Sequence, residues 1–90
     1  MNTRLTEQLN SELPDWKISD GKLFKEFNFK SFMEGINFIN KVALQAEIVD
    51  HHPDIFISFR TIKIQLFTHD VHKITDKDYK LAKEINNLKI

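Results

Sequence analysis

Three of the four histidines stand next to the regular elements that the sequence predicts. His51 and His52 come just before an alternating apolar segment, and His69 comes just after the next one. Neighbouring strands joined by a short turn pair antiparallel, so the start of the first lies beside the end of the second. We therefore expect His51, His52 and His69 to meet at one edge of a sheet.

Clustered histidines favour acid–base chemistry. Histidine has an ordinary pKa of about 6.5, so both of its protonation states are accessible near neutral pH. Two histidines beside one substrate can protonate a leaving hydroxyl and accept a proton from a nearby nitrogen, which eliminates water without a nucleophile. Positioned acid–base groups typically accelerate such steps by about 10²–10⁴-fold.

A metal site is the competing interpretation of the same residues. His51, His69 and His72, with Asp50 or Asp70, could supply three or four ligands. The two adjacent histidines are poor chelators in an extended segment, because successive side chains point to opposite faces. We therefore expect no metal.

Taken one at a time, other candidate residues have explanations that need no function. Asp78 fits a helix cap, and Glu47 fits a solvated residue late in a helix. Pro53 fits a helix stop, and His72 fits a surface loop. Only their combined spacing with the clustered histidines raises them to candidates.

Composition restricts the classes of protein. The 90 residues suffice for one domain, 1–90, and 41% of them are hydrophobic, with eight Phe. Thirteen basic and thirteen acidic residues cancel, so we expect no nucleic-acid partner. Cysteine is absent, which excludes disulfides and thiolate chemistry. No run approaches the roughly 20 apolar residues of a membrane span, and no signal core follows Met1, so we expect a cytoplasmic protein without a membrane partner.

The first third of the chain predicts a short helix and a hairpin. Residues 3–12 have a weak helical pattern that Pro14 ends. A short strand follows at 16–18, and Asp20-Gly21 is a hairpin signal before a return strand over 22–29. On that strand we expect Leu23, Lys25, Phe27 and Phe29 to share one face.

A long helix is predicted from Ser31 to about Ile48. Glu34 stands three residues after Ser31, which is the spacing of a capping box. Apolar residues then recur at helical intervals. The predicted buried stripe is Phe32, Ile36, Ile39, Val42, Ala43 and Ala46.

Two strands and a last helix complete the pattern. Apolar residues alternate over 55–59 and 62–66, with a turn near Arg60-Thr61. Thr75 then caps a helix that has Asp78 at its third position. Its apolar face is Leu81, Ala82, Ile85 and Leu88. The fold class is therefore α+β: a four-stranded antiparallel sheet with two long helices on one face, in the order (α)-β-β-α-β-β-α.

The order and spacing of these residues resemble a known family. The matching residues are Glu47, His51-His52-Pro53, Phe59, His69 and Asp78. An acidic residue, a His-His-Pro triplet, an aromatic residue, a further histidine and an Asp at these intervals are similar to the pattern of the pterin-4a-carbinolamine dehydratases. The resemblance covers nearly the whole chain.

The resemblance implies an activity and roles for residues. The reaction is conversion of a 4a-hydroxytetrahydropterin to quinonoid dihydropterin plus water, without a cofactor. His51 and His69 would be the acid–base pair, and His52 would bind and orient the pterin. Glu47 and Asp50 would hold its polar edge. Pro53 belongs to the binding segment, Thr68 would line the pocket, and Asp78 would support the His69 region.

The same resemblance implies partners. We expect a homo-dimer or homo-tetramer and a functional link to an aromatic amino acid hydroxylase in tetrahydrobiopterin recycling. The alternative is a non-enzymatic binding module, because animal relatives also serve as dimerisation cofactors of a homeodomain transcription factor. Ile55 stands where many members have Trp, Phe59 is often Tyr, and Val71 replaces a Cys of some members; these differences affect the shape of the pocket and leave the proton-transfer groups intact.

Overall fold

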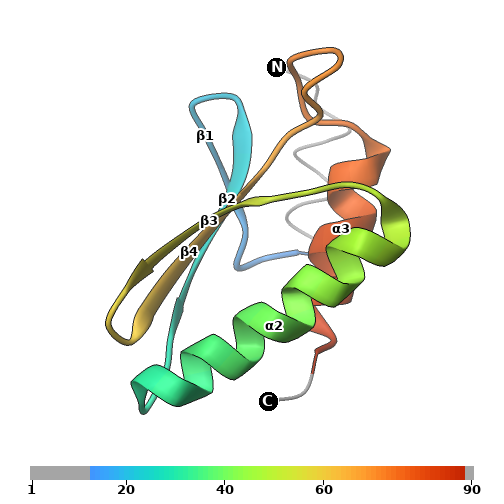
Figure 1. Cartoon of the computed structure of the whole chain (residues 1–90). Coiled ribbons are helices and arrows are strands. Elements are labelled where there is room, and N and C mark those ends of the chain that lie inside the picture. Colours follow the sequence, from blue (N-terminus) through green and yellow to red (C-terminus); the bar gives the residue numbers. More distant parts are fainter. Residues whose placement is uncertain (1–12, 89–90) are drawn as a thin grey trace.

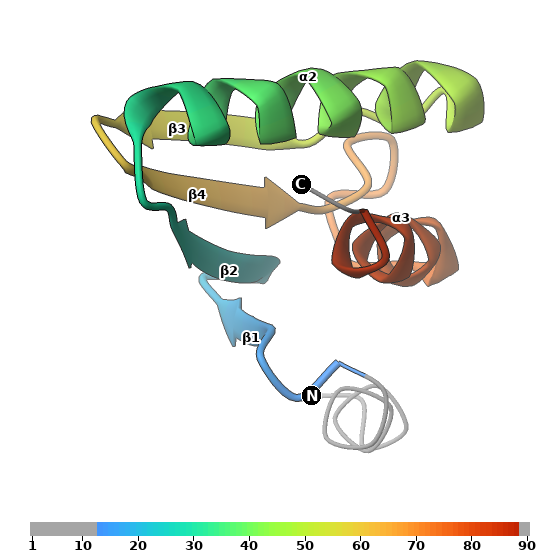
Figure 2. The same cartoon turned by 90° about the horizontal axis from the view of Figure 1, so that it is seen from below.

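The computed structural model describes residues 13–88, so the helix predicted over residues 3–12 lies outside the described residues. The described elements follow in the order β1, β2, α2, β3, β4, α3. The strands form one antiparallel sheet with the spatial order β1-β2-β4-β3. Both helices lie on the same side of this sheet (Figures 1 and 2). The predicted α+β architecture is confirmed.

The first hairpin joins β1 (Lys17–Ser19) to β2 (Lys22–Asn28). Asp20 and Gly21 have φ angles of 54° and 74°. Two successive positive φ angles give a turn whose twist matches the strands it joins, and Asp-Gly accommodates them at low cost. The predicted face of β2 is confirmed by its register with β4, in which Leu23, Lys25 and Phe27 stand opposite Leu66, Ile64 and Ile62.

Helix α2 (Phe32–Val49) begins and ends with identifiable caps. The Ser31 hydroxyl oxygen accepts a hydrogen bond from the Glu34 backbone N–H at 3.1 Å. The return half of the predicted capping box is not found among the described residues, where the buried Oε1 of Glu34 has no hydrogen-bond partner. At the other end Asp50 adopts the left-handed conformation, and its N–H bonds the carbonyls of Ala46 and Glu47.

The predicted buried stripe of α2 is partly wrong. Val42 and Ala46 are buried, and Ile39 packs against the core, but Phe32 and Ala43 are exposed. The buried side instead includes Gly35 and Phe38, which the prediction missed. The helix carries apolar residues around most of its circumference. A 3.6-residue period fits more than one such stripe, so the sequence alone does not identify the buried one.

The second hairpin joins β3 (Asp54–Ser58) to β4 (Thr61–Leu66). Strand β4 lies between β2 and β3, whereas β3 forms an edge of the sheet. The hairpin register runs from Ser58 opposite Thr61 to Asp54 opposite Gln65. The end of the hairpin that contains Asp54 is therefore the one next to His51 and His52, as predicted.

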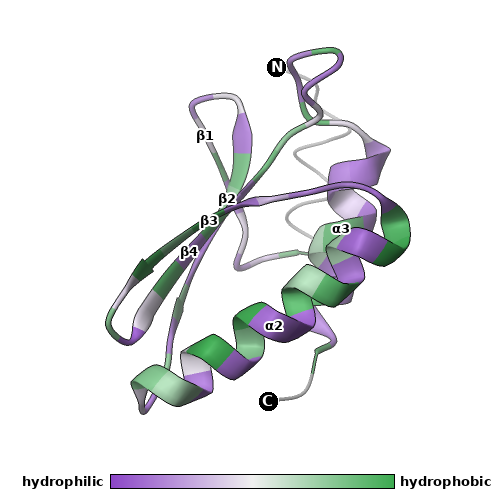
Figure 3. Cartoon of the chain, viewed as in Figure 1, coloured by the Kyte–Doolittle hydropathy of each residue, from purple (hydrophilic) through white to green (hydrophobic). Residues whose placement is uncertain are grey.

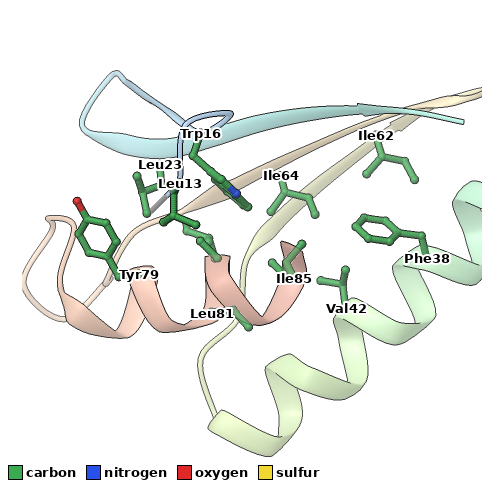
Figure 4. Packing of buried hydrophobic residues seen from close by; sticks show 12 residues of the cluster. Leu13, Trp16, Leu23, Phe38, Val42, Ile62, Ile64, Tyr79, Leu81 and Ile85 are labelled. Atoms are coloured by element: carbon green, nitrogen blue, oxygen red, sulfur yellow. The ribbon is translucent and has the colours of Figure 1, made fainter. Parts of the chain in front are cut away.

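Helix α3 (Asp76–Asn86) has the complete capping box predicted for it, with Thr75 as N-cap and Asp78 at the third position. The core lies between the sheet and the two helices, where side chains from both layers point toward one another (Figure 4). Its buried members are Leu13, Trp16, Leu23, Phe38, Val42, Ile62, Ile64, Leu66, Tyr79, Leu81, Ala82 and Ile85.

Large apolar side chains also remain exposed. Figure 3 shows hydrophobic residues along α2 and along β3, which is an edge strand of the sheet. The exposed members on these elements and the β3–β4 turn are Phe32, Met33, Leu44, Ile48, Val49, Phe56, Ile57 and Phe59. Neither helix of the described part combines the length and the apolar character needed to cross a membrane.

Candidate active site

The centre of the candidate site is a buried hydrogen bond between two elements far apart in the sequence. His51 Nε2 and Asp78 Oδ1 are 2.6 Å apart, joining the segment after α2 to the first turn of α3. The His51 side chain is 10% exposed, and that of Asp78 is 0% exposed. A buried carboxylate that contacts one ring nitrogen fixes the orientation of the imidazole and leaves the other nitrogen for a substrate.

The second carboxylate oxygen of Asp78 is also fully engaged. The Thr75 backbone N–H donates to Oδ2 at 2.8 Å, and the Thr68 hydroxyl donates to the same atom at 2.9 Å. The hydroxyl oxygens of Thr68 and Thr75 are 2.6 Å apart. Thr68 itself is buried. The capping box of α3 therefore has two roles, because it starts the helix and holds the carboxylate that contacts His51.

This network brings together two of the predicted segments. Asp78 reaches the region of His69 through Thr68, the preceding residue, but the histidine it bonds directly is His51. Thr75 was predicted only as a helix cap, and its part in the site was missed. A threonine three positions before a candidate aspartate was the available signal.

His52 has a separate carboxylate partner. Its Nε2 lies 2.5 Å from Oε2 of Glu47, in the last turn of α2. This pair is solvent-exposed on both sides. Asp50 lies between the two residues in sequence and is exposed, with its backbone engaged in the helix cap. Pro53, half-buried, leads from His52 into β3.

His69 lies in the turn that follows β4. Its ring packs on Phe67, with the ring centroids 4.3 Å apart. Alternate residues of an extended segment share a face, which is the signal that could have predicted this contact. His72 lies at the end of the same turn and is exposed, as predicted. Phe59, the aromatic residue of the motif, lies in the β3–β4 turn at the opposite end of that hairpin and is outside this site.

Two hollows adjoin the network of Asp78. A cleft of about 500 Å³ has His51 in its wall, together with Ile48, Val49 and Leu81. A second hollow of about 350 Å³ is lined by Thr68 and Thr75, among others. Cavities of these volumes accommodate small molecules. The described residues contain no group of three or more His, Asp or Glu side chains arranged to hold a metal ion.

The fold and the site define a class of protein. Its members are small antiparallel α+β domains in which a buried carboxylate supports one histidine and a second histidine–carboxylate pair is exposed. The chain belongs to the pterin 4 alpha carbinolamine dehydratase family, whose sequence model matches residues 1–88. The membership predicted from the spacing of the motif is confirmed.

Individual relatives agree with this membership. A protein of Picosynechococcus sp. is 44% identical over 98% of this chain and 100% of its own length, and a protein of Sulfolobus acidocaldarius is 38% identical over 86% and 85%. Both carry the provisional description pterin-4-alpha-carbinolamine dehydratase. A crystal structure of a transcriptional coactivator/pterin dehydratase from Brucella melitensis has a TM-score of 0.87 and 31% identity, covering 96% of this chain and 93% of the other.

A more distant solved structure shows the fold alone. This pterin dehydratase-like protein is described as a RuBisCO assembly factor of the alpha-carboxysome. It has a TM-score of 0.65 and 21% identity, covering 79% of this chain and 82% of its own. The same fold therefore occurs in a protein with a different stated role.

Proposed function

We propose that this chain is a hydro-lyase that dehydrates a 4a-hydroxytetrahydropterin to quinonoid dihydropterin and water. The observation that carries the proposal is the buried hydrogen bond between His51 and Asp78 in a chain of this family. A histidine with one nitrogen held by a buried carboxylate suits proton transfer through the other nitrogen. Relatives that match the chain over nearly its full length carry the name of this activity.

The reaction needs one proton moved in each direction. A base takes a proton from the ring nitrogen beside the reacting carbon, and an acid gives one to the departing hydroxyl, which leaves as water. We assign His51 and His69 to this pair. His52 orients the pterin, and the exposed Glu47 and Asp50 hold its polar edge. The reaction requires no cofactor, since the bond that breaks is a carbon–oxygen bond that acid–base catalysis alone can cleave.

The test is the dehydration rate of a freshly generated 4a-hydroxytetrahydropterin. We expect the native protein to accelerate it, and His51→Ala and His69→Ala each to reduce that acceleration more than tenfold, since positioned acid–base groups contribute about 10²–10⁴-fold. His72→Ala is the control, because it replaces an exposed histidine of the same turn as His69. Near-normal rates in both site variants would refute the acid–base assignment.

A chelator separates this mechanism from metal catalysis. We expect prolonged dialysis against EDTA to leave the dehydration rate unchanged, because the assigned steps use only side chains. A loss of activity that added Zn²⁺ restores would support the metal site considered for the same histidines.

We also propose that the protein acts as a homo-oligomer, dimer or tetramer. Its largest exposed apolar residues lie on α2 and along the edge strand β3, and such surfaces on a monomer favour association. Phe59, in the β3–β4 turn, adds to this apolar surface, because its side chain is 66% exposed. Light scattering on the native protein and on Leu44→Asp and Phe56→Lys variants would test both surfaces, and a native monomer would refute the proposal.

The physiological setting that this activity implies is pterin recycling in the cytoplasm alongside an aromatic amino acid hydroxylase. A second candidate role follows from the Brucella melitensis relative, whose description pairs a transcriptional coactivator with the dehydratase. An oligomer-disrupting variant of α2 that keeps the dehydration rate would separate a binding role from the enzymatic one. Loss of both together would leave the enzymatic role as the simpler account.

A further inference from the structure

The hydroxyl groups of Thr68 and Thr75 form a series of hydrogen bonds that ends at Asp78. The direction of each bond follows from the protons that are available. A hydroxyl has one proton to donate and two lone pairs to accept with. The Thr68 proton is used in the bond to Asp78 Oδ2. The bond between Thr68 and Thr75 must therefore use the proton of Thr75, and Thr68 accepts it. The Thr75 oxygen in turn accepts from the Lys77 backbone N–H at 3.3 Å.

Every donor in this series of hydrogen bonds consequently points toward Asp78. Oδ2 receives the Thr68 hydroxyl and the Thr75 backbone N–H, and both bonds fall at 2.8–2.9 Å. A carboxylate only accepts, whereas a protonated acid would need an acceptor for its own proton. Two donors at Oδ2 favour the charged carboxylate form of Asp78. In that form Oδ1 can only accept as well, so its partner His51 is a donor. His51 Nε2 therefore carries a hydrogen, and Nδ1 is the nitrogen that remains for exchange.

We propose that Thr68 and Thr75 are positioning residues that act through Asp78 to hold His51 in its Nε2–H tautomer, so that His51 exchanges protons with the substrate at Nδ1. Thr68 has this role in addition to its place in the wall of the smaller hollow. The exchange of protons with the substrate at Nδ1 rests on the proposed function. The tautomer does not, because it follows from the donors around one buried carboxylate.

The arrangement explains why two threonines meet at this point. Asp78 is completely buried, and a buried carboxylate is costly unless donors satisfy both oxygens. The backbone supplies one donor through the helix cap, and the segment after β4 supplies another through the Thr68 hydroxyl. If the Thr68 hydroxyl is removed, Oδ2 loses a donor and the carboxylate can rotate away from His51.

The variants are chosen in matched pairs. Thr68→Val removes the hydroxyl at nearly constant volume, whereas Thr68→Ser keeps it. Thr61→Val is the matched control, because it removes a threonine hydroxyl of β4 that donates to Asn28 at 2.9 Å, at the opposite end of the strand. Thr75→Ala interrupts the same series of hydrogen bonds at its other hydroxyl. Ser31→Ala is its control, because Ser31 is the N-cap of α2.

The primary measurement is the two-bond ¹H–¹⁵N correlation pattern of the His51 ring in labelled protein, in mildly alkaline buffer. This pattern distinguishes the two tautomers without any substrate. We expect a single Nε2–H pattern in the native protein, Thr68→Ser and both control variants. Thr68→Val and Thr75→Ala should add the Nδ1–H pattern, and Thr68→Val should lower kcat about tenfold with KM changed less than twofold.

Three results would overturn the proposal. The first is an Nδ1–H tautomer of His51 in the native protein. The second is an unchanged tautomer and kcat in Thr68→Val and Thr75→Ala. The third is a rise of KM alone in Thr68→Val, which would leave Thr68 with a pocket-lining role only. If the native protein fails to dehydrate the pterin but shows the Nε2–H pattern, the proposed function falls and the assignment of the tautomer remains.

Discussion

Two adjacent histidines of this chain have the same kind of partner in opposite surroundings. His51 contacts Asp78 and His52 contacts Glu47, at donor–acceptor distances of 2.6 and 2.5 Å. The first pair is nearly inaccessible to solvent, whereas the side chains of the second are 56% and 74% exposed. The distances are therefore equivalent, and the surroundings make the difference.

The surroundings determine what each contact can do. An exposed pair contributes about 0–1 kcal/mol to stability, since water competes for both groups. Breaking a buried pair by removing one partner costs about 3–5 kcal/mol, because the remaining group is left without compensation. A fixed ring suits proton transfer, which needs geometry, and an exposed ring can reorient to meet a ligand. The two histidines are thus suited to different tasks.

The largest expected effect comes from removing the buried carboxylate. Asp78→Ala should lower the free energy of unfolding by about 3–5 kcal/mol, because His51, Thr68 and the Thr75 N–H all lose their acceptor. Urea unfolding followed by circular dichroism measures it. Asp76→Ala is the control, since it removes an exposed carboxylate from the same helical turn. Equal losses in the two variants would mean that the buried network adds nothing beyond helix capping.

A smaller effect is expected from the exposed pair. Glu47→Gln should change the free energy of unfolding by less than about 1 kcal/mol. It should raise KM for the pterin severalfold while kcat changes little, because Glu47 is assigned to binding. Steady-state dehydration kinetics separate the two constants, with Glu26→Gln as an exposed control on β2. A fall in kcat without a change in KM would assign Glu47 to the chemical step and remove the distinction between the two pairs.

The contrast between the pairs could not be predicted from the sequence. Alternation, capping signals and the Asp-Gly turn predicted the strands and both helices, because these depend on local preferences. The spacing of the motif also predicted the family. Burial, however, depends on which elements cover each residue. Nothing local shows that α3 covers the ring of His51 while leaving His52 in solvent.

One wrong prediction and one incomplete one have the same origin. Phe32 was expected in the core and is 45% exposed, because α2 has several apolar sides and only packing identifies the buried one. Asp78 is expected to support the region of His69, which it reaches through Thr68, but its direct bond to His51 was not predicted. A chain position predicts that a residue starts a helix, but the partner of its side chain depends on how that helix lies against the segment after α2.

Lys25 provides a third case, in which only one member of an ion pair is buried. Its side chain is 17% exposed, and its Asp15 partner, 3.9 Å away, is 77% exposed. The ammonium also donates to Asn86 Oδ1 at 3.0 Å and lies over the ring of Phe27. Burial lowers the pKa of Lys25 below its ordinary value of 10.5, and the charge of Asp15 opposes this shift without cancelling it.

This shift predicts a dependence of stability on pH. A lowered pKa means that the folded protein binds the Lys25 proton less tightly than the unfolded chain does. Between the folded pKa and 10.5 the unfolded chain carries more protons, so Lys25 makes the native protein more stable as the pH rises through that window. The Lys25→Met variant has no ammonium group at this position, so its stability lacks this dependence on pH. We expect the native protein to gain stability relative to Lys25→Met between neutral pH and pH 10.5, measured by urea unfolding, with Lys63→Met giving the background of an exposed lysine. The opposite trend would mean that Asp15 outweighs burial, and that one exposed partner is enough to stabilise a largely buried charge.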